Sequence, residues 1–401
     1  FWRVKDKSAP HNAVTSTKKI MESAKSKKYR TRQDNKSMTN PKGKEYIMGI
    51  DIGYSGTKIF VENGCICFPS YAKKLEGMLN SSDEKDILYQ EDGSNEIYMI
   101  GYNAQNMTDD MDTNDTDGEL FSRKRYLDKR FKIIVNTALA LATDKKNDNR
   151  KLFVQTGLPS SYMSDADNLK KVFCKPASFK LKIGDKEWKH YSFELLKEQI
   201  DVMPQPSGGY YSVLTLNDGN EAPNARELLC GNTLVMDIGF DTFDWFGTKG
   251  RSLSCRESSD EIGMKEVFEK TCKKILDDTQ EDIRVSSIQK KLEDGYFEAV
   301  NEEDLTSEQK SINGYLEEAE NEIFEEAIRK AKSVTNSFRG YQNLIISGGT
   351  GEAWLEKIRE KLKGMKTLKI IPSNVNDHLP MIYSNARGYY FFRYRKMMGK
   401  K

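Results

Sequence analysis

The stretch "YIMGIDIGYSGTKIFV", from Tyr46 to Val61, combines two apolar runs with a turn of unusual composition. The first run ends around the carboxylate Asp51. The turn after it holds glycine, hydroxyl and lysine side chains, and the second run begins at Ile59. Apolar runs on either side of small polar residues predict a β-hairpin. A hairpin alone does not explain why an acid stands at the end of a buried strand.

Two later segments share this design, in which an apolar strand delivers a polar or glycine turn. They are "VMDIGFDTFD" (235–244) and "IISGGTGE" (345–352). Strands this apolar are buried on both faces of a sheet, and their ends open onto a common crevice. The hairpin and the segment at 235–244 both place Asp-Ile-Gly after the hydrophobic residues, so they look like related halves. We therefore expect Asp51 and Asp237 to face each other across the crevice.

Two facing carboxylates repel each other, and they persist when a cation lies between them. Mg²⁺ bound to nucleotide phosphates is the natural cation, because proteins hold it through waters with few carboxylates. The small residues of the turns present backbone N–H groups to phosphate oxygens, and Lys58 adds a point charge. One such turn is typical of an ordinary hairpin. Three in this order predict a nucleotide site in which Asp51 and Asp237 hold the metal through water.

The charge of the chain is unevenly distributed. A net charge of +2 over 401 residues combines a basic start, with 13 Lys and Arg against 4 Asp and Glu in residues 1–45, with a remainder of net charge −7. The basic stretch is poor in apolar residues, which predicts a flexible arm. The alternatives are a segment that binds DNA phosphates or docks on a neighbouring molecule, with one helix over residues 14–29.

Composition also limits the location of the protein. No apolar run reaches the roughly 18 residues of a membrane span, so we expect no membrane contact. The six cysteines are scattered along the chain. Such spacing predicts free thiols, as in the cytoplasm. The chain begins with Phe1, and we expect upstream sequence to be missing.

The order of these motifs resembles the actin/Hsp70/sugar-kinase superfamily. Within it, four segments are similar to ParM-type bacterial and archaeal actin-like proteins, over about residues 46–398. They are "TGLP" (156–159), "DVMPQPSGG" (201–209), "DIGFDTFD" (237–244) and "NARGYYFF" (385–392). The resemblance implies an α/β, actin-like fold, with two duplicated, ribonuclease H-like α/β domains around a nucleotide cleft. Each domain is expected to carry a smaller outer subdomain.

The resemblance also implies domain limits, with hinges near Asn232 and Asn385. The expected parts are the arm at 1–45, domain I at 46–231 plus 376–401, and domain II at 232–375 with a charged helical subdomain at 259–337.

The resemblance further implies roles for single residues. Gln205 would orient the attacking water, completing a catalytic set with Asp51 and Asp237. Read without the family, the prolines on both sides of Gln205 indicate a stiff surface turn. Asp241 departs from the family pattern, which favours small or hydroxyl residues in this loop. The implied nucleotide-binding residues are Gly53, Ser55, Gly56, Thr57 and Lys58 in phosphate loop one, Gly239, Asp241 and Thr242 in phosphate loop two, and Gly348, Gly349, Thr350 and Gly351 in the adenosine loop.

The implied function is that of a cytoplasmic filament-forming ATPase that segregates plasmid DNA, assembling with ATP and disassembling after hydrolysis to ADP. GTP remains an alternative to ATP. The implied partners are further copies of the chain and a DNA-bound adaptor, and the basic arm is a candidate contact for DNA or a neighbouring subunit. The alternative function is a small-molecule kinase of the same superfold. That reading needs a carboxylate base aimed at a substrate hydroxyl, and we find no convincing "sugar-loop" Asn–Asp pair. An Hsp70-like chaperone is disfavoured, because only 50 residues follow the adenosine loop, which leaves no room for a substrate-binding domain.

Overall fold

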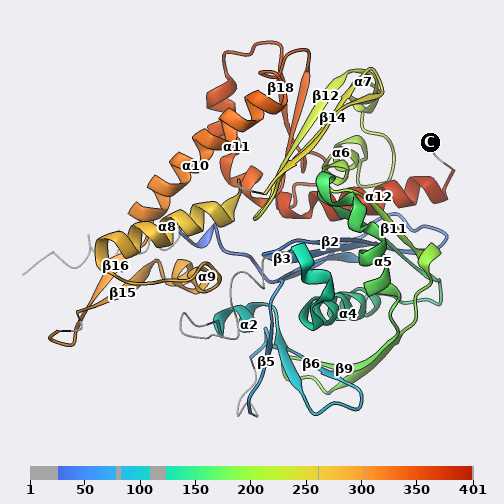
Figure 1. Cartoon of the computed structure of the whole chain (residues 1–401). Coiled ribbons are helices and arrows are strands. Elements are labelled where there is room, and N and C mark those ends of the chain that lie inside the picture. Colours follow the sequence, from blue (N-terminus) through green and yellow to red (C-terminus); the bar gives the residue numbers. More distant parts are fainter. Residues whose placement is uncertain (1–25, 78–82, 109–122, 261, 302, 400–401) are drawn as a thin grey trace, which may run out of the picture.

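The computed structural model describes residues 26–77, 83–108, 123–260, 262–301 and 303–399. Figure 1 shows two large sheets, one containing β2 and β3 and the other β12 and β18, with α6 and α12 between them. The first sheet has the order β1 (Asp34–Ser37), β4 (Gly64–Pro69), β3 (Gly56–Val61), β2 (Tyr46–Ile52), β8 (Leu152–Leu158) and β11 (Ile200–Pro204). The second sheet has the order β14 (Ser252–Ser259), β13 (Phe243–Lys249), β12 (Asn232–Ile238), β17 (Asn343–Ser347) and β18 (Lys369–Pro372).

The two sheets repeat one topology. In the first, β4, β3 and β2 are antiparallel, and β8 and β11 continue parallel to β2. In the second, β14, β13 and β12 are antiparallel, and β17 and β18 continue parallel to β12. The strand β1 has no counterpart and extends the edge of the first sheet. The predicted duplication of two α/β halves is therefore present, with β2 and β12 at equivalent positions.

Both faces of β2 are buried, as its composition predicts. Ile47 packs on one face with Tyr390 of α12 (Ser384–Met397), whereas Met48 and Ile50 pack on the other with residues of α4 (Lys129–Thr143). The alternation of side chains along a strand makes this possible. The predicted start of the last helix near residue 384 is correct.

Each half carries an outer layer. The region 259–337, predicted as charged and helical, also contains a β-hairpin whose strand "TSEQKS" lacks the apolar alternation that would reveal it. The outer layer of the first half is an antiparallel sheet of β10 (Lys189–Phe193), β9 (Ala177–Ile183), β6 (Ile87–Glu91), β7 (Ile97–Ile100) and β5 (Ala72–Lys74). That of the second half contains α8 (Met264–Thr279), α9 (Val285–Asp294), β15 (Tyr296–Asn301), β16 (Thr306–Ser311) and α10 (Asn313–Val334). The remaining helices are α2 (Tyr102–Asn106), α5 (Ala166–Cys174), α6 (Pro206–Leu214), α7 (Ala225–Cys230) and α11 (Gly349–Leu362), with short 3₁₀ turns at Arg123–Leu127, Ser160–Asp165, Lys197–Gln199 and Met381–Tyr383.

The helices α6 and α12 cross at two glycines. A Cβ on Gly388 would lie 1.8 Å from the carbonyl oxygen of Gly208, so the two backbones touch there. On its other side α6 packs on the second sheet, where Val213 joins a cluster with Val235. The α6–α12 crossing thus joins the two halves directly behind the crevice.

The start of the described chain corrects the prediction of a flexible arm up to residue 45. Tyr29 is 8% exposed and Arg30 is 6% exposed, and β1 pairs with β4. Residues 26–45 therefore belong to the fold. Composition did not predict this, because one buried tyrosine and a short polar edge strand add few apolar residues to the segment. Residues 1–25, which include most of the helix predicted at 14–29, lie outside the described residues.

The two free cysteines of β4, Cys65 and Cys67, are made less reactive by burial. Cys65 and Cys67 are fully buried, and burial raises the pKa of the Cys65 thiol to about 11. All six cysteines are free, as predicted. Within the described ranges, every helix is too short or too polar to span a bilayer.

Candidate nucleotide site

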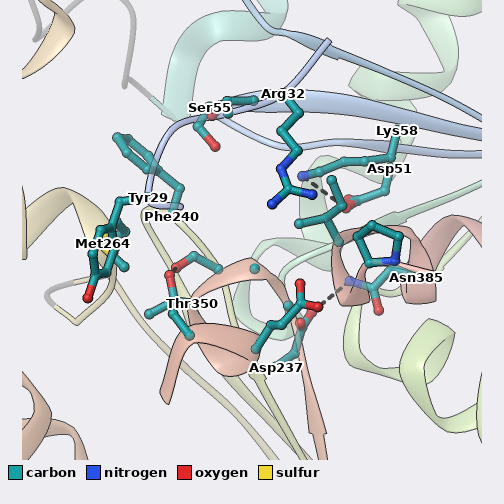
Figure 2. Close-up of a pocket in the computed structure, with 18 of the residues that line it drawn as sticks. Tyr29, Arg32, Asp51, Ser55, Lys58, Asp237, Phe240, Met264, Thr350 and Asn385 are labelled. Atoms are coloured by element: carbon teal, nitrogen blue, oxygen red, sulfur yellow. Dashed lines mark hydrogen bonds and ion pairs between the residues drawn. The ribbon is translucent and has the colours of Figure 1, made fainter. Parts of the chain in front are cut away.

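The carboxyl ends of β2, β12 and β17 meet at one pocket between the two sheets (Figure 2). Asp51 comes from the end of β2 and Asp237 from the end of β12, and Gly348 directly follows β17. In the parallel pair of β12 and β17, Asp237 lies opposite Ser347. The predicted meeting of Asp51 and Asp237 at one crevice is therefore present in the structure.

Asp51 is paired with the lysine of its own hairpin. In the antiparallel register of β2 and β3, Asp51 lies opposite Lys58, and Asp51 Oδ2 is 3.6 Å from Lys58 Nζ. Asp51 is 4% exposed. The hairpin thus delivers one acid and one cation to the same side of the pocket. Figure 2 shows both side chains there, with Ser55 nearby.

Asp237 is held at one oxygen only. Its Oδ2 accepts a hydrogen bond of 2.8 Å from Asn385 Nδ2, whereas its Oδ1 is buried and has no hydrogen-bond partner among the described residues. A Cβ on Gly348, whose φ is +88°, would approach this Oδ1 to 2.9 Å. A buried carboxylate oxygen without a partner calls for a donor or a cation. The residues present therefore fit a hydrated cation at this position.

The surroundings of Asp237 favour its neutral form when no ligand is bound. Burial, and then the nearby carboxylate Asp244, raise the pKa of Asp237 to about 7. Burial also raises the pKa of Asp244 to about 6, although Asp244 accepts hydrogen bonds of 2.9 Å from the backbone N–H of Ser160 and from Thr242 Oγ1. Keeping both buried acids ionised costs free energy, and a cation bound next to Asp237 would lower that cost.

This arrangement predicts a pH dependence of stability. The pKa of Asp237 is raised from 3.8 to about 7 on folding, so the folded state binds more protons in that range and loses stability as pH rises through it. Asp237→Asn keeps an oxygen for Asn385 but cannot ionise. We expect the nucleotide-free variant to become more stable than the wild type between about pH 5 and about pH 8, by a margin that grows with pH. Urea unfolding across that range measures this, and an unchanged margin contradicts it.

In phosphate loop two, Asp241 pairs with a lysine of the outer layer and does not contact Asp237. Asp241 Oδ1 is 3.1 Å from Lys265 Nζ at the start of α8, and Asp241 is 5% exposed. Burial raises the pKa of Asp241, while Lys265 opposes that shift. Asp241, the residue that departs from the family pattern, thus joins the loop to the outer layer of the second half through an ion pair.

The adenosine loop is joined to phosphate loop two. Thr350 Oγ1 donates a hydrogen bond of 2.6 Å to the carbonyl oxygen of Gly239. A Cβ on Gly348 would lie 2.2 Å from the carbonyl oxygen of Ile238, so only glycine fits at this close approach. The loop opens directly into α11, whose N-terminus faces the pocket through Gly349.

Gln205 lines the pocket from the start of α6. It precedes α6, its backbone N–H donates 2.7 Å to the carbonyl oxygen of Leu158, and it lines the pocket. The hydroxyl of Tyr389 on α12 donates 3.3 Å to the carbonyl oxygen of Gln205. The backbone of Gln205 is thereby fixed by both β8 and α12, which suits a positioning role for its side chain.

Most of the predicted residues come together, but not all reach the pocket. Thr57 is fully buried, and its hydroxyl lies 2.9 Å from Ser70 Oγ. A Cβ on Gly351 would pack on Ile346, inside the second half. Among the predicted residues, the pocket is lined by Asp51, Ser55, Lys58, Gln205, Asp237, Gly239, Gly348, Gly349 and Thr350. An adjoining hollow that shares several of these residues takes in Gly53, Asp241 and Thr242. Gly56, Thr57 and Gly351 line neither hollow.

Sequence reasoning missed three features of the pocket. Asn385, expected only near a hinge, bridges the halves: it holds Asp237, and its Oδ1 accepts 2.9 Å from the backbone N–H of Gly209. Asp244 lies opposite Asp237 in the register of β12 and β13, which the repeat with Asp51 and Lys58 could have revealed. The segment around Arg32 also reaches the pocket, and nothing in its composition signals that.

Comparisons with known proteins agree with this architecture. Residues 49–208 match the family model described as the N-terminal domain of actin-like proteins. A 15-stranded ParM filament from Clostridium botulinum has 19% identity and a TM-score of 0.67, covering 87% of this chain and 98% of that chain. The archaeal actin homologue Ta0583 has 18% identity and a TM-score of 0.61, covering 87% of this chain and 99% of that chain. The Alp12 filament structure has 18% identity and a TM-score of 0.54, covering 88% and 99%. No curated protein matches the chain.

The chain thus has the actin-like fold, as two sheets of one topology around a pocket of acids and glycine turns indicate. More particularly, residues 49–208 match the model of the actin-like protein N-terminal domain, and the solved structures that share the fold include ParM-type actin-like proteins.

Proposed function

We propose that this chain is a nucleotide-dependent, filament-forming actin-like ATPase that segregates plasmid DNA. The observation that carries the proposal is the pairing of Asp51 and Asp237 at equivalent strand ends of two repeated sheets, in one pocket with Lys58 and glycine turns. Support from relatives is coarser. The similar ParM and Alp12 structures are filaments, and one similar Ta0583 structure, with a TM-score of 0.57, is a complex with ADP.

In the proposed site, ATP lies between the two halves with Mg²⁺ as its counter-ion. Asp51 and Asp237 would hold the ion through water, and the ion would neutralise charge on the phosphates. The structure supports this because Asp237 Oδ1 is buried and accepts no hydrogen bond from any residue that the structure describes. In the described part of the chain, no group of three or more metal-binding side chains is present, so the phosphates themselves would supply much of the coordination.

The residues of the chain have separate tasks in this account. Lys58 and the backbone around Ser55 and Gly239 bind phosphate oxygens, and the loop from Gly348 gives the adenosine close access to the backbone. Gln205 orients the attacking water but cannot take its proton, which suits slow hydrolysis governed by positioning. GTP is the alternative nucleotide, because no feature of the sequence separates the two bases.

The wider proposal concerns assembly. ATP would favour filaments and hydrolysis would weaken subunit contacts, in the cytoplasm, with a DNA-bound adaptor that couples filament ends to the plasmid. We propose two domains, at 46–231 plus 376–401 and at 232–375. The last helix is assigned to the first of them because α12, at residues 384–397, packs on β2. Residues 1–25 remain the candidate contact for DNA or a neighbouring subunit.

Light scattering of the purified chain after addition of Mg-ATP tests this function, with phosphate release followed in the same sample. We expect scattering to rise and then to decay as phosphate accumulates. Consumption of ATP without any rise in scattering would overturn the filament proposal. A phosphorylated small-molecule product in that case would support the kinase alternative.

A further inference from the structure

A segment that precedes the region matched by the family model lines the pocket. We call residues 26–37 the strap. Five consecutive residues of the strap, 28–32, line the pocket together with the phosphate loops. Figure 2 shows the side chain of Arg32 directed into the pocket, on the side where Ser55 and Lys58 lie. The strap is therefore part of the wall that a nucleotide would touch.

The first part of the strap is fixed to the second half of the molecule. The hydroxyl of Tyr29 donates 2.9 Å to Glu320 of α10, and the Tyr29 ring belongs to the same buried cluster as Met264 of α8. The backbone N–H of Thr31 donates 3.0 Å to Gln289 Oε1 of α9. These contacts come from three helices of one outer layer.

The second part of the strap is fixed to the first half. Gln33 Nε2 donates 2.8 Å to the carbonyl oxygen of Lys85, and Gln33 Oε1 accepts 2.9 Å from the backbone N–H of Tyr102. The strand β1 then pairs with β4. Arg32 thus lies between Thr31, bonded to one half, and Gln33, bonded to the other. Its two neighbours in the chain are held, while Arg32 itself is exposed and lines the pocket.

Arg32 differs from the other cations that line the pocket. Lys58 faces the carboxylate of its own hairpin, and Arg30 pairs with Glu293 at 3.2 Å. Lys28 lies over a tyrosine ring of the strap, 5.1 Å from the centroid. Within the described ranges, Arg32 has no ion pair and no side-chain hydrogen bond. Burial raises the pKa of Glu352, which lines the same pocket, and the charge of Arg32 opposes that shift. A guanidinium that lines the pocket without an ion pair is available for an anionic ligand.

We propose that Arg32 binds the phosphates of the nucleotide, so that the strap completes a site that the actin-like core leaves open. This inference rests on the proposed function, because it requires a nucleotide in the pocket. A planar guanidinium matches two phosphate oxygens at once, and Lys58 supplies only a point charge. Because the strap is bonded to both halves, phosphate bound by Arg32 also links them across the cleft.

The test compares Arg32→Ala with the matched control Lys27→Ala in the full chain. Lys27 belongs to the same strap and carries the same charge, but it is exposed and pairs with Glu293 outside this pocket. Calorimetric titration with ATP, ADP and adenosine, each with Mg²⁺, gives the affinities. We expect Arg32→Ala to weaken ATP and ADP binding about tenfold or more, leaving adenosine unchanged, since a charge-assisted hydrogen bond is lost. Lys27→Ala is expected to bind all three as the wild type does.

Each other outcome has a clear meaning. If the wild type binds ATP and Arg32→Ala binds it equally well, the role of Arg32 is overturned and the proposed function stands. The same holds if Lys27→Ala loses as much affinity, or if adenosine binding falls with ATP binding, because the effect is then one of general charge or of strap position. If the wild type binds no nucleotide, both proposals fail. Thermal unfolding of both variants confirms that they are folded.

Discussion

Asp237→Asn is expected to lower ATP-driven phosphate release by about 10–100-fold, the range typical when an acid that acts on a metal through other ligands is removed. Asp237 is 1% exposed, and its Oδ1 has no protein partner within the described residues, so this oxygen is available to a cation. The variant keeps the shape of the side chain and the oxygen that Asn385 requires. A steady-state phosphate assay with saturating Mg-ATP measures the loss.

The expected gain in stability of the same variant separates chemistry from folding. A loss of activity in a protein that is at least as stable as the wild type cannot come from unfolding. Asp277→Asn, which changes an exposed acid on α8 far from the pocket lining, provides the control and should leave turnover unchanged. Phosphate release within about twofold of the wild type for Asp237→Asn would remove the acid pair from the mechanism.

Gly388→Ala is expected to lower the free energy of unfolding by about 3 kcal/mol or more, or to prevent folding, because overpacking against a rigid neighbour is costly. Its Cβ would lie 1.8 Å from the carbonyl oxygen of Gly208 and 2.6 Å from the carbonyl carbon of the same residue. Both atoms belong to the backbone of α6, so no side chain can move aside. Denaturant unfolding followed by circular dichroism measures the effect.

A second glycine in a helix provides the opposite result. Gly314 of α10 is exposed, and a Cβ there would meet no atom within 4 Å. Gly314→Ala is therefore expected to leave stability unchanged or to raise it by up to about 1 kcal/mol, through helix propensity. If Gly388→Ala were as harmless as Gly314→Ala, the close crossing of α6 and α12 would be wrong.

The crossing matters for the pocket as well as for stability. Asn385 lies one turn before Gly388 on α12, and it holds both Asp237 and the backbone of Gly209 on α6. A helix displaced by an added methyl group would carry Asn385 away from Asp237. The position of Asn385 in the pocket thus depends on the close packing of Gly388 against Gly208.

The parts of the fold that could be predicted are those indicated by short, contiguous sequence patterns. Asp51 and Asp237 each end an apolar strand and precede a glycine, and this pattern was sufficient to place them at one crevice. The third turn was recognisable for the same reason, because Gly348 and Gly349 follow the apolar strand at 343–347. Parallel and antiparallel pairing then brings such strand ends together without further information.

The parts that could not be predicted depend on long-range polar contacts. Asp241 forms an ion pair with Lys265 in a helix that begins after the loop, and the Thr57 hydroxyl lies beside Ser70, which follows β4, so the local motif does not indicate either contact. The strap is the clearest case. Tyr29 finds Glu320, which is 291 positions away in the sequence, and no local pattern encodes that bond.

The account rests on one claim, that the pocket between the two repeated sheets is a Mg-nucleotide site. Calorimetric titration of the full chain with ATP, in Mg²⁺ and in excess chelator, tests it most directly. We expect one binding event per chain in Mg²⁺, markedly weaker binding in chelator, and the loss of that Mg²⁺ dependence in Asp237→Asn. Absence of binding, or binding that is indifferent both to the chelator and to Asp237→Asn, would contradict the account.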